Sequence, residues 1–377
     1  MPQFRTLITP VVDAHESPQL PLRVHFVHRR SKHLAAIPLL FCHGWPGSFI
    51  EASKIINSLC DPESLHFDIN QSAVAFHTVV PSVPGFGFGD PSPKSDFGLK
   101  ETADLFDALM LRLGYDSYIV HGTGWYVKLW RSDGLLLLSF VRGFKVARLI
   151  ALRHQTRCVA VHTTSPHIPH CSFRGNLLNY IRYRIAKLSK ARISMLSFGY
   201  VANDFNYPNP PRNCHHPLGL ERQDCQRMQT LSYSLCDSPV GLLAYMIDVI
   251  RQSYGSYSWT TTDILNWTML QWLPGPEAGL KWLKAASQEV SGKSWWRQWV
   301  ATPLGISYFR PSFGTDFTTP SPPVWASNIF RLTWIRRHEK SARFPAWDVP
   351  DDLVLDIRDF VRTLIAQHQL SFSLQQS

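Results

Sequence analysis

Short apolar runs alternate with helical stripes over the first half of the chain. Residues 37–42 (IPLLFC) form a continuous apolar run, which is typical of a strand buried on both faces of a parallel sheet. Residues 49–59 follow with apolar positions at helical spacing. The run 76–80, the helical stripe 100–113 and the run 118–121 continue the alternation. The pattern predicts an α/β fold with a mostly parallel sheet flanked by helices.

The alternation stops in the middle of the chain and returns near its end. After one further strand at 158–162, residues 166–286 read as helical, with a Pro- and Asn-rich stretch, and suggest an inserted lid. Strand-like runs at 304–309 and 329–336 and an amphipathic helix at 351–366 follow. We therefore expect four parts: an N-terminal segment 1–30, a first core part 31–165, a helical lid 166–290 and a second core part 291–377.

Composition limits the classes of protein that the chain can belong to. Its 377 residues are 45% hydrophobic and 18% charged, which suits a large folded domain and excludes wholesale disorder. The sequence has no apolar run near the ~20 residues that cross a bilayer and no secretory signal, so we expect a cytoplasmic protein without a transmembrane segment. Seven scattered cysteines without a CxxC pair favour a reducing environment.

Neither the charge nor the cysteine pattern indicates a nucleic acid or a metal. The net charge of +10 is dispersed, and its densest stretch, between Arg182 and Arg192, accompanies no known nucleic-acid motif, so we interpret it as a solvated helix face. Cys214, His215 and His216 lack a distant fourth ligand and are interpreted as a loop.

Several motifs together resemble those of a known family. Residues 43–48 read HGWPGS, and residues 237–244 read DSPVGLLA. Further matches lie at 2–4 with 22–28, at 84–88 (PGFGF) and at 344–350 (FPAWDVP). The chain therefore resembles the microsomal-type epoxide hydrolases of the α/β-hydrolase superfamily over most of its length, with a shortened N-terminal segment.

The resemblance implies a two-step reaction that uses neither cofactor nor metal. In the family, an Asp at the tight turn between a strand and a helix attacks an epoxide carbon and forms an ester. A His, oriented by an acid, activates the water that hydrolyses this ester. Two lid tyrosines donate protons to the epoxide oxygen, and backbone N–H groups around HGWP hold the oxyanion. The implied substrate is a small apolar epoxide, or a related small molecule.

The positions that match the catalytic residues of the family carry other side chains here. The nucleophile position is Gly124, which has no side chain, and the base position is Arg343, which stays protonated at neutral pH. Asp316 is the candidate acid, although a role in a loop or as a helix N-cap is at least as well supported and Ser312 fits the local sequence about as well. His338 lies five residues before the base position and is a poor replacement for it.

The other expected site residues follow from the same motifs. The two lid tyrosines align near Leu220 and near Trp282 or Leu283, so neither phenol is kept. With Trp45 and Phe86, these residues are expected to line an apolar cavity beside Gly124. The expected oxyanion-hole region consists of His43, Gly44, Trp45 and Pro46, with His43 as a structural turn residue.

A 17-residue segment, 126–142 (YVKLWRSDGLLLLSFVR), interrupts the family pattern directly after Trp125. Joining Trp125 to Gly143 restores the small residue and the amphipathic helix that the family has there. Trp-Tyr-Val can be encoded as TGGTACGTN, which contains a fungal-type splice donor, and an AGG codon for Arg142 would supply the acceptor. We hypothesise that the segment is a translated intron; a tolerated surface insertion is the alternative.

The sequence thus predicts an epoxide hydrolase by descent, forming a vicinal diol, whose activity is impaired in this chain. A setting in fungal secondary metabolism is an expectation from the general character of the sequence. The alternative is a non-catalytic or repurposed protein that binds an apolar ligand. A serine hydrolase is disfavoured, because the chain has no Gly-x-Ser-x-Gly motif.

Overall fold

The computed structural model describes most of the chain. The described residues are 1–9, 21–62, 74–131, 134–141, 143–166, 168–169, 176–205, 228–251, 257–290, 294–310 and 321–370.

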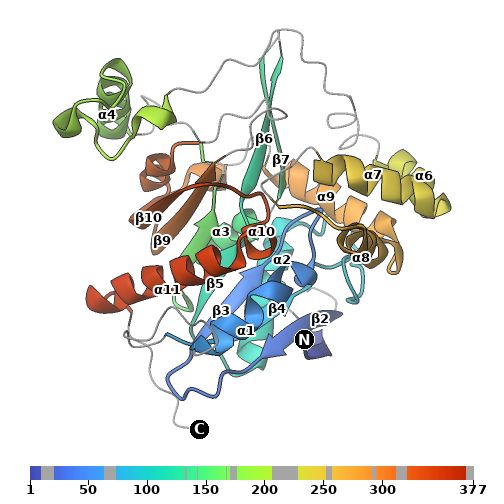
Figure 1. Cartoon of the computed structure of the whole chain (residues 1–377). Helices are drawn as coiled ribbons and strands as arrows, with labels where there is room; N and C mark the ends of the chain where they lie inside the picture. The colour runs from blue at the N-terminus through green and yellow to red at the C-terminus, as the bar shows by residue number, and fades with distance from the viewer. Residues whose placement is uncertain are drawn as a thin grey trace.

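An eight-stranded sheet forms the centre of the molecule (Figure 1), with the order β1-β2-β4-β3-β5-β8-β9-β10. β1 and β2 pair antiparallel with each other, and β2 pairs antiparallel with β4, whereas the six strands from β4 to β10 run parallel. All six parallel strands therefore end at the same edge of the sheet. The strands are β1 (Gln3–Ile8), β2 (Leu22–Arg29), β3 (Ile37–Cys42), β4 (Phe76–Pro81), β5 (Tyr118–Gly122), β8 (Cys158–Thr164), β9 (Val300–Arg310) and β10 (Phe330–Ser341).

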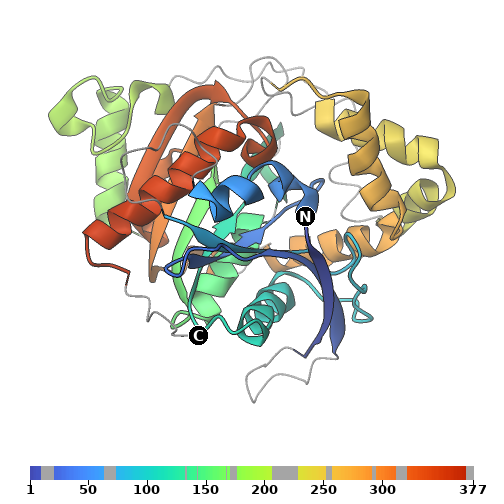
Figure 2. The ribbon, with the colours of Figure 1, turned by 60° about the horizontal axis from the view of Figure 1, so that its bottom comes forward.

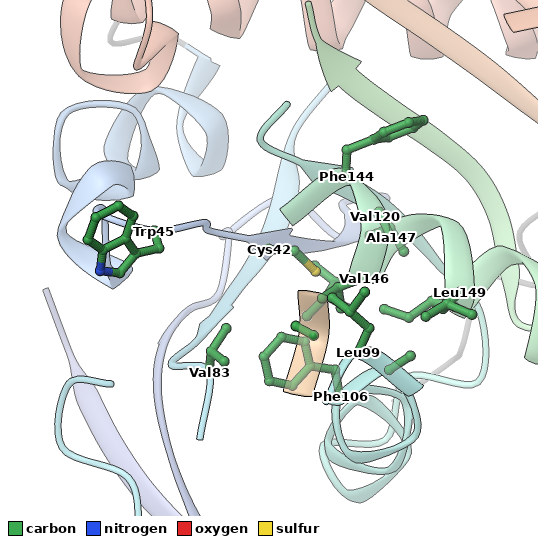
Figure 3. Packing of buried hydrophobic residues seen from close by; sticks show 14 of the residues in the cluster. Cys42, Trp45, Val83, Leu99, Phe106, Val120, Phe144, Val146, Ala147 and Leu149 are labelled. Carbon is green, nitrogen blue, oxygen red and sulfur yellow. The ribbon is translucent and has the colours of Figure 1, made fainter. Parts of the chain in front are cut away.

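Helices cover both faces of this sheet, because successive residues of its central strands point to opposite sides. In β3, Leu39 and Phe41 belong to one buried cluster, and Leu40 and Cys42 belong to the other. Figure 3 shows the second cluster, in which Cys42 lies among residues of α2 and α3. The first face is covered by η1 (Phe49–Lys54), α1 (Ile56–Cys60), α10 (Pro345–Asp348) and α11 (Pro350–Ala366), and the second by α2 (Leu99–Arg112) and α3 (Gly143–Arg153).

The helices between β8 and β9 lie in two separate groups. α6, α7, α8 and α9 lie together at one end of the molecule, whereas α4, η3 and η4 lie at the opposite end, beside β10 (Figures 1 and 2). Among the described residues, α7, α8 and α9 of the first group contact the loops at the carboxyl edge of the sheet, so we reserve the word lid for α6–α9. The bounds are α4 (Leu177–Leu188), η3 (Ser194–Leu196), η4 (Ala202–Asp204), α6 (Met228–Asp237), α7 (Pro239–Arg251), α8 (Thr261–Trp272) and α9 (Pro276–Val290).

The segment after Trp125 forms a separate two-stranded hairpin. β6 (Trp125–Arg131) pairs antiparallel with β7 (Gly134–Val141), and Trp125 stands opposite Val141. The hairpin extends away from the large sheet (Figure 1).

The predicted α/β class is confirmed, and each predicted strand matches an observed one, although β9 begins four residues earlier and β10 ends five residues later than predicted. Two short 3-10 helices, η5 (Ser294–Arg297) and η6 (Pro323–Asn328), complete the described elements. Cys42, Cys60 and Cys158 are buried free thiols, and Cys236 is an exposed one. Within the described residues, no single helix meets the length and hydropathy criteria for a membrane span, although α6 and α7, bent by 119° at their junction, meet them as a pair.

Candidate active site

The HGWPGS loop leaves β3 at the carboxyl edge of the sheet, and His43 joins it to the next loop. The backbone N–H of Val83 donates to Nε2 of His43 at 3.1 Å, and Nδ1 lies 3.3 Å from the carbonyl oxygen of Gly44. Burial lowers the pKa of His43 to about 4, so the ring is neutral at pH 7. His43 thus holds two loops in place, as a structural turn residue would.

The loop that contains Phe86 packs directly on the lid helix α9. The centroid of the Phe86 ring lies 6.1 Å from that of His43 and 5.8 Å from that of Trp282. The Phe86 and Trp282 rings are arranged edge to face. Gly85 has a φ of +88°, and a Cβ there would lie 2.8 Å from the backbone carbon of Ala278. Glycine is therefore required at this position both by its conformation and by the close approach of α9.

Trp45 and Pro46 contact two other lid helices. The Trp45 ring lies 5.9 Å from the ring of Tyr245 in α7, and Nε2 of Gln271 in α8 donates to the carbonyl oxygen of Pro46 at 3.3 Å. Trp45 is buried, and Figure 3 shows its ring well apart from the packing around Cys42. The sequence analysis did not single out Tyr245, a lid phenol close to the HGWP turn that follows the DSPVGLLA motif directly.

Gly124 lies two residues beyond the end of β5, with no room for a side chain. Its N–H donates to Oγ1 of Thr164 at 3.3 Å. A Cβ on Gly124 would overlap the carbonyl oxygen of Thr164 and would lie 2.9 Å from Oγ1 of Thr163 and 3.1 Å from Cα of Pro166. The neighbouring Thr123 and Thr163 are buried, and their hydroxyls donate to the carbonyl oxygens of Cys42 and Gly122. Neither of these two described threonines beside Gly124 therefore offers an exposed nucleophile.

The chain leaves the core at Gly124 and returns to the same place at Gly143. The N–H of Phe144 donates to the carbonyl oxygen of Thr123 at 2.9 Å. A Cβ on Gly143 would overlap the carbonyl oxygen of Cys42 and would lie 2.7 Å from Oγ1 of Thr123, so this position needs a glycine. The β6–β7 hairpin is thus an excursion whose two ends meet.

Arg343 follows β10 at the same edge of the sheet and connects the core with the lid. The side chain is buried, and its Nη1 donates to the carbonyl oxygen of Val249 in α7 at 2.9 Å. The backbone N–H groups of Arg343 and Phe344 both donate to Oδ2 of Asp348, at 2.8 and 2.9 Å. The base position therefore holds a cation that binds a lid carbonyl.

Two buried carboxyl groups accompany Arg343. Burial raises the pKa of Asp348 to about 6, and it raises the pKa of Glu51 well above its ordinary value, with Asp348 adding to the rise and Arg343 opposing it. Glu51 lies under the HGWPGS loop, where a Cβ on Gly47 would overlap its carboxyl group. In the sequence, Glu51 follows Ser48 with the spacing of a helix capping box, which gives no sign of this buried contact.

The structure places the remaining candidates as follows. Asp316, Leu220, Ser312 and the Cys214–His216 cluster lie outside the described residues. Trp282 and Leu283 are buried on α9, and Nε1 of Trp282 donates to Oγ1 of Thr102 at 2.9 Å, which ties the lid to α2. No group of three His, Cys, Asp or Glu side chains in the described part of the chain could hold a metal ion.

His338 is engaged elsewhere and does not take the place of the base. Its Nε2 lies 2.6 Å from Oδ2 of Asp356 in α11, and its ring stacks on Phe309 with centroids 4.3 Å apart. Both contacts hold the ring against the face of the sheet that α11 covers.

Comparison with known proteins agrees with this fold. The family described as alpha/beta hydrolase fold matches residues 37–125, and the family described as Epoxide hydrolase N terminus matches residues 1–52. The first match ends at Trp125, where the hairpin begins. The structure resembles that of the Aspergillus niger epoxide hydrolase, with a TM-score of 0.65 and 25% identity over 96% of this chain and 78% of that one. The fold is therefore that of an α/β hydrolase.

Two further proteins are similar to this chain. Epoxide hydrolase 1 of Sus scrofa is 27% identical over 368 residues, which cover 92% of this chain and 73% of that protein. The juvenile hormone epoxide hydrolase of the silkworm Bombyx mori shares the fold, with a TM-score of 0.66 and 20% identity over 97% of this chain and 77% of that one. In sequence and in fold, the chain is thus similar to epoxide hydrolases of the α/β-hydrolase superfamily, and the comparisons support that family for it.

Proposed function

We propose that this protein is an epoxide hydrolase by descent whose chain, as its sequence stands, does not complete the two-step hydrolysis of an epoxide. The substrate class of the ancestral reaction is a small apolar epoxide, and the product is a vicinal diol. The observation that carries the proposal is the environment of Gly124. The nucleophile position has no side chain, and the surrounding atoms leave no space for one.

The environment of Arg343 supports the same proposal. A general base must accept a proton near neutral pH, and a guanidinium does not do so. The side chain of Arg343 donates to the carbonyl oxygen of Val249 in the lid and lies near the carboxyl groups of Glu51 and Asp348. We therefore assign it a structural role, in which its positive charge also opposes theirs.

A second candidate function is the binding of an apolar ligand without turnover. The contacts of Arg343 with α7 and of Trp282 with α2 favour it, because they hold the lid against the core without any catalytic group. Such a protein would keep the lid and the two aromatic residues of the core that are expected to line the cavity, Trp45 and Phe86. It would release its ligand unchanged.

One experiment, on the transcript and on the purified protein, distinguishes the two candidate functions. The mature transcript is sequenced across the codons for 126–142, and the encoded protein is purified and assayed against small aryl and alkyl epoxides. We expect a spliced message without these codons and no diol above the uncatalysed rate from the full 377-residue chain. Steady-state diol formation by that chain would refute the proposal, and a spliced message that retains the codons would refute the intron hypothesis. Binding of an intact epoxide without turnover would favour the second candidate.

A further inference from the structure

The segment 176–205, at the end of the molecule opposite the lid, has an exposed surface that is both apolar and basic. It contains α4 and η3 (Figures 1 and 2). Leu188 in α4 is 82% exposed, and Met195 in η3 is 89% exposed. Its other large exposed apolar side chains are Leu177, Leu178, Ile181, Ile193, Leu196, Phe198 and Val201.

The exposed apolar residues of α4 form a stripe along the helix. At about 100° per residue, Leu177, Ile181 and Leu188 fall within a narrow sector, and Leu178 lies beside it. The same geometry places Arg182 on one flank of the stripe and Arg184 and Lys187 on the other. This arrangement is an apolar stripe bordered on both sides by cations, and we call it the α4 face.

The opposite side of α4 attaches the helix to the body of the protein. Nδ2 of Asn179 donates to Oδ1 of Asn328 at 2.8 Å, and the ring of Tyr183 lies 5.7 Å from that of Trp325 in η6. The α4 face consequently points away from the core and is held in that orientation.

The segment itself carries an excess of cations. Five of them lie between Arg182 and Arg192, and the sequence has no Asp or Glu from residue 176 until Asp204. Within the described part of the chain no carboxylate pairs with them; instead, the Arg184 guanidinium lies 5.9 Å from the ring of Tyr180, and the Lys187 ammonium lies 5.9 Å from that of Tyr183. The charge of the α4 face therefore remains available to an anionic partner.

We infer that the α4 face docks onto the surface of an anionic phospholipid bilayer. Cations would contact the headgroups while the leucines and isoleucine enter the boundary of the acyl chains, which is how basic amphipathic helices bind lipid. A nucleic acid would also attract the cations, but it offers nothing to an aliphatic stripe. The inference concerns a surface far from Gly124 and Arg343, and it stands whether or not the protein turns over an epoxide.

The test is co-sedimentation of the full chain with phosphatidylcholine vesicles that contain or lack phosphatidylserine. We expect binding to the anionic vesicles that weakens with added salt and little binding to the neutral ones. The triple variant Arg182→Gln, Arg184→Gln, Lys187→Gln should bind anionic vesicles about 100-fold more weakly. The triple variant Leu178→Gln, Ile181→Gln, Leu188→Gln should lose binding at high salt, where only apolar insertion remains.

A matched control removes three exposed cations elsewhere, in the variant Lys32→Gln, Lys284→Gln, Arg297→Gln, which has the same net charge as the α4 variant. The control should bind anionic vesicles nearly as well as the parent chain, and circular dichroism should show that all variants are folded. The inference is overturned if the parent chain does not sediment with anionic vesicles, or if the control loses as much affinity as the α4 variant.

Discussion

The backbone N–H of Phe144 donates to the carbonyl oxygen of Thr123 at 2.9 Å, although the whole β6–β7 hairpin lies between these two residues in the sequence. Thr123 also donates its own N–H to the carbonyl oxygen of Cys42, at the end of the neighbouring strand β3. The strand β5 and the helix α3 therefore meet as they would if no segment separated them. This relationship gives physical support to the interpretation of 126–142 as an insertion.

The first prediction is that the chain without residues 126–142 folds. The bond between Thr123 and Phe144 already closes the loop, and shortening a closed loop lowers the entropic cost of folding only slightly. We expect the free energy of unfolding of the deletion variant to lie within about 1 kcal/mol of the parent value, or above it. Urea denaturation followed by circular dichroism measures this. An unfolded deletion variant would show that the hairpin is an integral part of the fold.

The second prediction concerns the space around Gly124. In the full chain, Gly124→Ala should lower the free energy of unfolding by about 1–3 kcal/mol, because the added methyl group overlaps the backbone of Thr164. In the deletion variant the cost should be smaller, since the tight turn between strand and helix can re-form there.

Gly241→Ala in α7 is a matched control for this substitution. Its Cβ would lie 3.2 Å from Cβ of Ser238 and 3.9 Å from the carbonyl oxygen of Ser234, and alanine favours a helix by about 1 kcal/mol over glycine. We expect little change, or a small gain in stability, in both chains. Equal effects of Gly124→Ala in the full and shortened chains would contradict the proposed role of the hairpin.

The sequence predicted the central elements well where the local pattern is strong. The continuous apolar run 37–42 corresponds to β3, with Leu39 and Phe41 on one buried face and Leu40 and Cys42 on the other. The helical stripe 100–113 corresponds to α2, which ends at Arg112, and Gly114 just beyond it has a φ of +86°. Both features are set by residues close in sequence, which is why periodicity finds them.

Local sequence patterns do not predict contacts between residues that are far apart in the chain. Nothing near Arg343 in the sequence indicates its bond to Val249, and the spacing of Ser48 and Glu51 suggests only a helix cap. The hairpin was recognised as an anomaly but not as a hairpin, although Asp133-Gly134 between two apolar runs is a common hairpin turn signal. The expected roles of Asp316 and Leu220 remain predictions.

The third prediction is that Arg343 holds the lid. Replacing it in Arg343→Met removes the donor to Val249 and the cation near Glu51 and Asp348, which should cost about 1–3 kcal/mol. Limited proteolysis should then cut α6–α9 faster than in the parent chain. The control is Arg297→Met, an exposed arginine, which should leave both properties unchanged. Equal proteolysis of the two variants would show that the Arg343 contact does not restrain the lid.

The fourth prediction is a loss of stability in mild acid caused by two buried histidines. His121 and His162 lie with their Nδ1 atoms 3.0 Å apart, and Nε2 of His162 lies 3.1 Å from Oγ of Ser307. Burial lowers the pKa of His121 to about 3 and lowers that of His162 well below its ordinary value. The unfolded chain therefore takes up protons near pH 6.5 that the folded chain refuses.

The contribution of this pair is fully present above about pH 6.5 and decreases as the pH falls toward the folded pKa, by up to about 1.4 kcal/mol per pH unit for each histidine. Urea denaturation at a series of pH values measures the decrease. The double variant His121→Asn, His162→Asn should show a shallower dependence between pH 6.5 and 4.5. Parallel curves for the variant and the parent would remove the pair as the cause.

The most direct test of the central claim restores the nucleophile and the base together. In the chain without 126–142, Gly124→Asp with Arg343→His should recover diol formation, whereas either single change should not, because the two groups act as one unit. Gly124→Asn with Arg343→His is the matched control that lacks only the nucleophile. Recovery should be partial, since the lid positions near Leu220 and Leu283 lack the phenols whose proton donation is worth about 10²–10⁴-fold.

The decisive measurement is steady-state diol formation from an aryl epoxide, with mass spectrometry of the protein for a covalent ester. The account predicts turnover by the double variant, an ester that accumulates on the Gly124→Asp single variant, and neither in the Asn control. A folded double variant that forms neither diol nor ester would contradict the account, and the ligand-binding function would then be favoured.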